Sequence, residues 1–160
     1  MANHEGGCLC GDIRYTVTAD PLRVTFCHCR FCQKSTGGPY LVEPIFQKSD
    51  VVINQGTPSE YEHISEGSGL KLTTKFCGRC GTKVYLGFER FPDNCGIYAG
   101  TFDDPNWFDR SPDVARHIFL ESAQRGTLIP AGMEVYEKHA VQNDGTPAEP
   151  QMFDEPHEIK

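Results

Sequence analysis

Hydrophobic and polar positions alternate over short stretches of this chain, a pattern typical of strands. In residues 13–18, Ile13, Tyr15 and Val17 fall on one face and polar side chains on the other. Glycine, proline, asparagine or aspartate separates most such stretches. We expect further strands at 23–27, 41–46, 51–54, 59–64, 70–76, 83–88, 96–102, 117–121 and 133–137. Helical turns are expected only at 30–36 and 112–116. Because short strands dominate, the pattern predicts a mainly β protein, a sandwich or an open barrel.

The length of 160 residues suits one folded domain. We expect this single domain to span residues 1–140. Residues 141–160 combine acidic side chains with Pro147, Pro150 and Pro156, a composition that predicts a mobile tail rather than a second domain.

The charge balance narrows the classes of partner. Asp and Glu number 22 against 15 Lys and Arg, which gives a net charge of −7. Nucleic-acid phosphates and anionic membrane surfaces both require a basic face, so neither partner is expected. The N-terminal residues show no basic stretch followed by an apolar one, and no apolar run has the length of a membrane span. We therefore expect a cytoplasmic protein.

Eight cysteines provide the candidate chemistry, and seven of them fall in three short motifs. The motifs are Cys8-Leu9-Cys10, Cys27-His28-Cys29-Arg30-Phe31-Cys32 and Cys77-Gly78-Arg79-Cys80. In a reducing compartment, clustered cysteines bind metal or perform chemistry more often than they form disulfides. Both spacings allow two sulfurs to reach the separation of about 3.8 Å that a tetrahedral zinc site requires.

Seven clustered cysteines divide naturally into four and three. The three within residues 27–32 can hold one zinc locally, and the two separated pairs can close a second site. A single four-cysteine site, an iron–sulfur cluster and disulfides are the alternatives, because spacing alone does not establish which pair joins which. Cys95 belongs to no motif and is expected to be a buried free thiol.

Four segments together resemble one known family. The segments GGCLCGDIRY, CHCRFCQKSTGGPY, KFCGRCGTKVY and GIYAGTFDDP, followed by His117-Ile118-Phe119, look like the glutathione-dependent formaldehyde-activating enzymes, a family that includes centromere protein V-like proteins. This resemblance implies the zinc-containing Mss4-like fold, a mainly β sandwich or open barrel of short antiparallel strands.

The resemblance also implies a role for each clustered cysteine and two zinc ions per chain. Cys8, Cys10, Cys77 and Cys80 match the ligands of the family's structural zinc. Cys27, Cys29 and Cys32 match the cysteines of its open catalytic zinc.

The implied activity is the condensation of glutathione with formaldehyde to S-(hydroxymethyl)glutathione, which is classed as a carbon–sulfur lyase reaction. The expected partners are glutathione or a similar small thiol and a small aldehyde, and the oligomeric state is left open. Three thiolate ligands make zinc a weak Lewis acid, so we favour a zinc that carries a thiolate over one that activates water. The alternative is a non-enzymatic zinc module that carries glutathione or binds a protein partner.

Overall fold

Short strands make up most of the regular structure of this protein, which confirms the prediction of a mainly β fold. The computed structural model describes residues 3–160, and the chain divides into two units. Unit 1 comprises the described residues up to Arg23 together with Glu43–Phe108, and unit 2 comprises Val24–Val42 and Asp109–Lys160. Within residues 3–160, no helix has the length and apolar character needed to cross a membrane.

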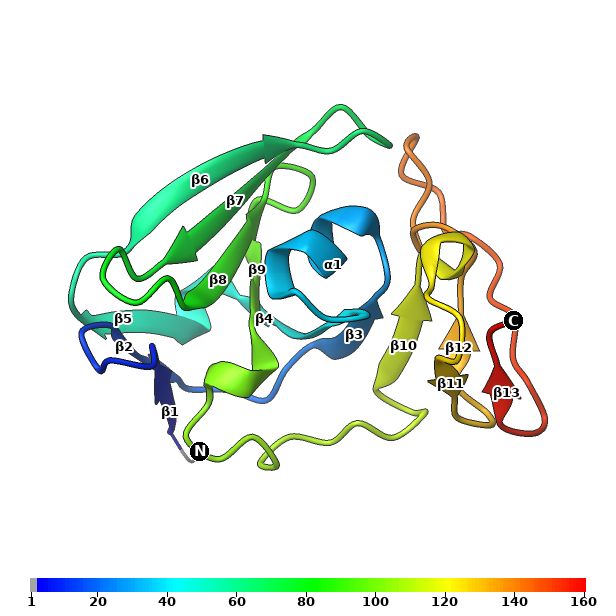
Figure 1. The fold of residues 1–160 in the computed structure, drawn as a ribbon, viewed down its shortest axis with the longest axis horizontal. Coiled ribbons are helices and arrows are strands. Elements are labelled where there is room, and N and C mark those ends of the chain that lie inside the picture. Colours follow the sequence, from blue (N-terminus) through cyan, green and yellow to red (C-terminus); the bar gives the residue numbers. More distant parts are fainter. Residues whose placement is uncertain (1–2) are drawn as a thin grey trace. The chain divides into compact units, whose positions relative to one another are not determined.

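Unit 1 is built from antiparallel strands, which Figure 1 shows in blue to green. Three strands form one sheet in the order β1-β2-β5, and further strands follow one another in the order β4-β9-β8-β7-β6. Their bounds are β1 His4–Gly7, β2 Arg14–Val17, β4 Leu41–Gln47, β5 Val51–Gln55, β6 Ser59–Ile64, β7 Lys71–Phe76, β8 Lys83–Phe88 and β9 Asn94–Ile97. Two short 3-10 helices, Lys48–Asp50 and Ala99–Thr101, belong to the same unit.

The alternating face predicted at residues 13–18 lies in the core of unit 1. Ile13, Tyr15 and Val17 are all buried, and the Tyr15 hydroxyl lies 2.9 Å from the Thr101 hydroxyl. The hydrogen bond satisfies the one polar atom of an otherwise apolar ring. The strand that carries these residues therefore anchors the turn before it, which contains Cys8 and Cys10.

Unit 2 contains the only α-helix of the described residues and a set of parallel strands. Its strands lie in the order β12-β10-β3, and β10 runs parallel to both neighbours, unlike the antiparallel strands of unit 1 (Figure 1). A parallel pair requires a long connection, and 87 residues separate the end of β3 from the start of β10. The elements are β3 Arg23–Cys27, α1 Arg30–Thr36, β10 Ala115–Ile118, β11 Leu128–Ile129, β12 Glu134–Val135, β13 His157–Glu158 and the 3-10 helix Leu120–Ser122.

The expected helical turn at 30–36 coincides with α1. At 112–116 the chain makes a single hydrogen-bonded turn, in which the Ala115 N–H donates to the Ser111 carbonyl at 2.9 Å, and β10 begins at Ala115. The expected strand at 96–102 begins earlier, as β9, and ends in a 3-10 turn. Strands β1, β11 and β13 were not predicted; the last two are only two residues long, too short for a periodic signal.

The expected tail, residues 141–160, makes backbone contacts with the earlier part of unit 2. Strand β13 pairs with β11, and Gln151 and Val135 exchange two backbone hydrogen bonds. The tail's mobility and the domain boundary at residue 140 stay predictions.

Candidate metal centres

Four cysteines converge in unit 1 from two turns that lie far apart in the sequence. Cys8 and Cys10 lie between β1 and β2, and Cys77 and Cys80 lie between β7 and β8. The Cys10 sulfur is 3.6 Å from that of Cys8 and 3.7 Å from that of Cys77, and all four sulfurs lie within 4.8 Å of one another. These separations match the roughly 3.8 Å between the sulfurs of a tetrahedral zinc site. The cluster can therefore hold a metal ion.

Backbone hydrogen bonds hold both turns in shape. The Gly81 N–H donates to the Cys77 carbonyl at 2.8 Å, and Gly81 has a φ of 75°, which a residue with a side chain rarely adopts. The Ile13 N–H points at the Cys8 sulfur at 3.2 Å. Such N–H groups stabilise a thiolate, the form of cysteine that binds metal. The turns thus present their sulfurs in a metal-binding arrangement through local structure.

Thr82 favours the charged form of one thiol in this four-cysteine cluster. Hydrogen bonds with its side chain and its backbone lower the pKa of Cys80 to about 5. The Thr82 hydroxyl also accepts a hydrogen bond from the backbone N–H of Leu9 at 3.2 Å, which links the two turns of the cluster.

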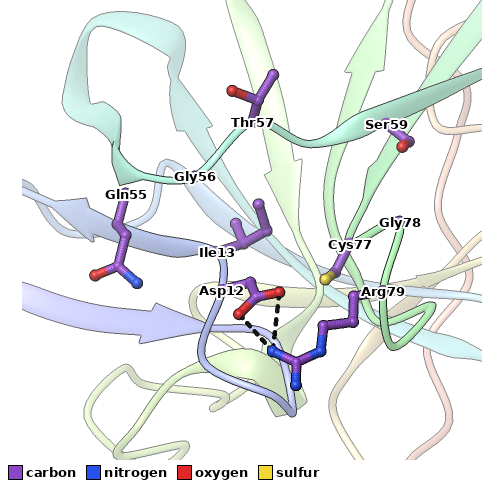
Figure 2. Close-up of a pocket in the computed structure, with 9 residues that line it drawn as sticks. All are labelled: Asp12, Ile13, Gln55, Gly56, Thr57, Ser59, Cys77, Gly78 and Arg79. Atoms are coloured by element: carbon purple, nitrogen blue, oxygen red, sulfur yellow. Dashed lines mark hydrogen bonds and ion pairs between the residues drawn. The ribbon is translucent and has the colours of Figure 1, made fainter.

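A cavity of about 450 Å³ borders the four-cysteine cluster, and Figure 2 shows its lining residues. Cys77 forms part of its wall. The Arg79 guanidinium and the Asp12 carboxylate face each other there, with Nη1 and Oδ1 3.0 Å apart. This ion pair joins the two cysteine turns on their solvent side, where screening makes it a weak contribution to stability.

Three cysteines gather in unit 2 where β3 passes into α1. Cys27 ends β3, Cys29 is the N-cap of α1, and Cys32 lies in its first turn. The Cys27 and Cys29 sulfurs are 3.4 Å apart, and all three sulfurs lie within 4.8 Å of one another. Cys27 and Cys32 are buried and Cys29 is half-buried, so solvent reaches the cluster on the Cys29 side. Within residues 3–160, this metal-ligand group has three members.

Hydrogen bonds within the three-cysteine cluster shift the pKa values of Cys29 and Cys32 in opposite directions. Hydrogen bonds from the thiols of Cys27 and Cys32 lower the pKa of Cys29 to about 3, and the N–H of Cys32 also points at its sulfur. The same contacts raise the pKa of Cys32 well above its usual value. The hydrogen bonds thus favour the thiolate form of Cys29, which is the form of cysteine that binds a metal cation.

His28 lies between two of these cysteines and faces away from them. Its side chain is fully buried, and its Nε2 lies 2.9 Å from Nδ1 of His117 on β10. The ring of Phe26 stacks on His117 at 4.6 Å. Burial lowers the pKa of both histidines to about 4, so both rings are neutral near pH 7. The pair connects the three-cysteine segment to β10.

Cys95 lies in neither cluster. It is fully buried in β9 as a free thiol, which agrees with its expected role, and burial raises its pKa to about 11. A thiol in this state is a poor nucleophile at neutral pH.

Sequence reasoning missed Gln33, a buried glutamine in α1 that contacts the three-cysteine segment. The side chain of Gln33 donates hydrogen bonds to the carbonyls of His28 and Ser122, which are far apart in the sequence, so no local motif indicates its role.

The chain belongs to the glutathione-dependent formaldehyde-activating enzyme family, whose model matches residues 3–122. The match spans both cysteine clusters. The resemblance seen in the sequence motifs is thereby confirmed.

Two individual proteins are also similar. A Halomonas elongata protein named "Putative glutathione-dependent formaldehyde-activating enzyme" is 26% identical over 121 residues, which cover 74% of this chain and 75% of that protein. A crystal structure of a Rhodobacter sphaeroides protein has a TM-score of 0.51 and 19% sequence identity, and the match covers 62% of this chain and 87% of that one. The second likeness concerns the fold alone.

Proposed function

We propose that this protein is a zinc-dependent enzyme that joins the thiol of glutathione to a small aldehyde, with formaldehyde as the substrate. The product would be S-(hydroxymethyl)glutathione, and the reverse cleavage makes the enzyme a carbon–sulfur lyase. The proposal places the enzyme in the cytoplasm, where thiols are kept reduced.

The three-cysteine cluster is the observation that carries this proposal. A catalytic zinc site supplies three protein ligands and keeps a position for substrate, whereas a structural site supplies four. Among residues 3–160, one cysteine cluster has three members and the other has four. We therefore assign one zinc to Cys27, Cys29 and Cys32 as the catalytic ion. We assign a second, structural zinc to the cluster of Cys8, Cys10, Cys77 and Cys80.

The chemistry that a bound zinc supplies is deprotonation of a coordinated thiol near neutral pH. The protein's own residues prepare the site for it. Cys27 and Cys32 form its buried side, and the half-buried Cys29 leaves one side open to a small thiol from solvent. Helix α1 holds Cys29 and Cys32 one turn apart, because Cys29 is its N-cap and Cys32 lies in its first turn.

The proposed reaction balances without an oxidant or a reductant. The glutathione sulfur forms a bond to the aldehyde carbon, and the carbonyl π electrons move to oxygen. The thiol loses one proton and the former carbonyl oxygen gains one, which makes it the new hydroxyl group.

Calorimetry with glutathione and S-methylglutathione tests the thiol-binding step. The thiol of free glutathione is protonated near pH 7, so binding through its sulfur should release about one proton per molecule. The heat of binding should then depend on the ionisation enthalpy of the buffer. The methylated analogue should bind much more weakly. Equal affinity for both compounds, with no buffer dependence, would contradict the proposal and favour a module that recognises the rest of the tripeptide.

A rate assay tests the aldehyde step. S-(hydroxymethyl)glutathione should form faster with the protein than without it, and Cys29→Ser should remove most of the difference. Cys95→Ser is the matched control, because Cys95 is a buried thiol outside both clusters. Formation at the uncatalysed rate with zinc-loaded wild-type protein would reject the enzymatic function.

A further inference from the structure

Gln33 is a buried side chain whose hydrogen bonds span the three-cysteine segment. It lies in α1, directly after Cys32, and is 4% exposed. Its side-chain nitrogen donates to the carbonyl of His28 at 2.6 Å and to the carbonyl of Ser122 at 2.7 Å. Both hydrogens of the amide group are therefore used, and both go to backbone oxygens.

The amide oxygen of Gln33 has partners of its own. It accepts a hydrogen bond from the Arg30 guanidinium and a longer one, of 3.3 Å, from the side-chain nitrogen of Gln124. These partners establish the orientation of the amide, since the opposite orientation would place its oxygen against two carbonyl oxygens. A buried amide with all of its hydrogen bonds satisfied is rigid.

The position of the His28 carbonyl explains what this rigidity does. His28 separates Cys27 from Cys29, and Gln33 adjoins Cys32, so the bond from Gln33 to His28 joins the two ends of the cysteine segment. The backbone N–H of His28 donates in turn to the Ile118 carbonyl at 3.0 Å. The segment is thus held by α1 on one side and by β10 on the other.

We propose that Gln33 is a positioning residue that sets the separation of the Cys27, Cys29 and Cys32 sulfurs, and thereby the affinity of this cluster for a metal ion. The inference rests on the proposed metal-binding role of the three-cysteine cluster. Groups that hold ligands from outside a metal site change metal affinity or activity by about 10- to 100-fold when they are replaced. We expect replacement of Gln33 to lower the zinc affinity of the three-cysteine cluster within this range.

The test compares Gln33→Met and Gln33→Glu with the wild type in the full-length, zinc-loaded protein. Methionine preserves the length of the side chain without either hydrogen bond. Glutamate preserves its shape and the bond from Arg30 but, when ionised, donates to neither carbonyl. Competition with a coloured chelator measures the zinc affinity of the weaker site. Cobalt substitution supplies a second readout, because the sulfur-to-cobalt charge-transfer bands report the geometry of the thiolates.

Gln55→Met is the matched control. The side-chain amide of Gln55 also donates to a carbonyl beside a cysteine motif, that of Gly11 at 2.8 Å, but Gln55 is exposed and lies next to the four-cysteine cluster.

Gln124→Ala is a milder variant, because it removes only the exposed side chain that donates to the Gln33 amide oxygen. It should weaken the three-cysteine site by about 2- to 10-fold, the effect of one hydrogen bond.

The outcomes separate the inference from the proposed function. A wild-type protein that binds metal only at the four-cysteine cluster would refute the catalytic-site assignment itself. If the wild type binds two ions and folded Gln33→Met retains its affinity within threefold, with unchanged cobalt bands, Gln33 has no positioning role. If both Gln33 variants fail to fold, Gln124→Ala decides: weaker zinc binding with altered cobalt bands supports the role, and wild-type behaviour overturns it.

Discussion

Replacing one cysteine in each cluster should destabilise the protein to different extents, with Cys77→Ser more harmful than Cys29→Ser. Cys77 belongs to the cluster that joins two distant turns; its sequence separation from Cys10 is 67 residues. In the three-cysteine cluster the largest sequence separation, from Cys27 to Cys32, is only five residues. A cross-link that closes a long loop removes more conformational entropy from the unfolded chain than one that closes a short loop.

The loop lengths indicate the size of the difference. Loop-closure entropy grows as (3/2)RT ln n, so loops of 67 and five residues differ by about 2 kcal/mol. At roughly 2–4 °C per kcal/mol for a chain of this size, Cys77→Ser should melt about 4–8 °C below Cys29→Ser. Cys77 is also buried, so the new hydroxyl group adds a desolvation cost in the same direction.

Thermal unfolding of zinc-loaded protein, followed by circular dichroism or calorimetry, measures this difference. Cys95→Ser is the control for the cost of burying a serine hydroxyl without loss of a metal ligand, because Cys95 is fully buried and lies in neither cluster. The assignment of a structural and a catalytic cluster is wrong if Cys29→Ser lowers the melting temperature as much as Cys77→Ser does.

Three further predictions follow from the same geometry. Protein purified without chelator should contain two zinc ions per chain by elemental analysis, one for each cysteine cluster, and a reproducible value of one in folded protein would contradict the division. The stability of the wild type should fall as the pH drops from about 6.5, the pKa of an unfolded histidine, toward the folded pKa of about 4 for His117, by at most about 3 kcal/mol for this group. His117→Asn places an oxygen near the position of Nδ1 and does not titrate, so denaturant titrations should show a smaller loss over this range; parallel curves would refute the argument. Gly56→Ala should cost about 1–3 kcal/mol more than Gly69→Ala in denaturant titrations, because both glycines have positive φ but only at Gly56 would a Cβ collide with the Asp12 carbonyl. Equal costs would show that the Asp12 turn moves aside freely.

Much of this protein was predictable because its signals are local. The alternation of Ile13, Tyr15 and Val17 depends only on the two-residue period of a strand, and these residues do form the buried face. The spacing of Cys27, Cys29 and Cys32 places their sulfurs together through the geometry of a single strand-to-helix turn. The helix at 30–36 occurs where it was expected.

The tertiary structure decided whatever depends on residues far apart in the chain. It placed Cys10 beside Cys77, a pairing that the spacing of the motifs left open. It also paired β10 in parallel with β3, and this register places His117 beside His28, 89 residues away. The same arrangement brings the Ser122 carbonyl to Gln33, again across 89 residues. Hydrophobic periodicity carries no information about such contacts, because it records which face of an element is buried and not which element covers it.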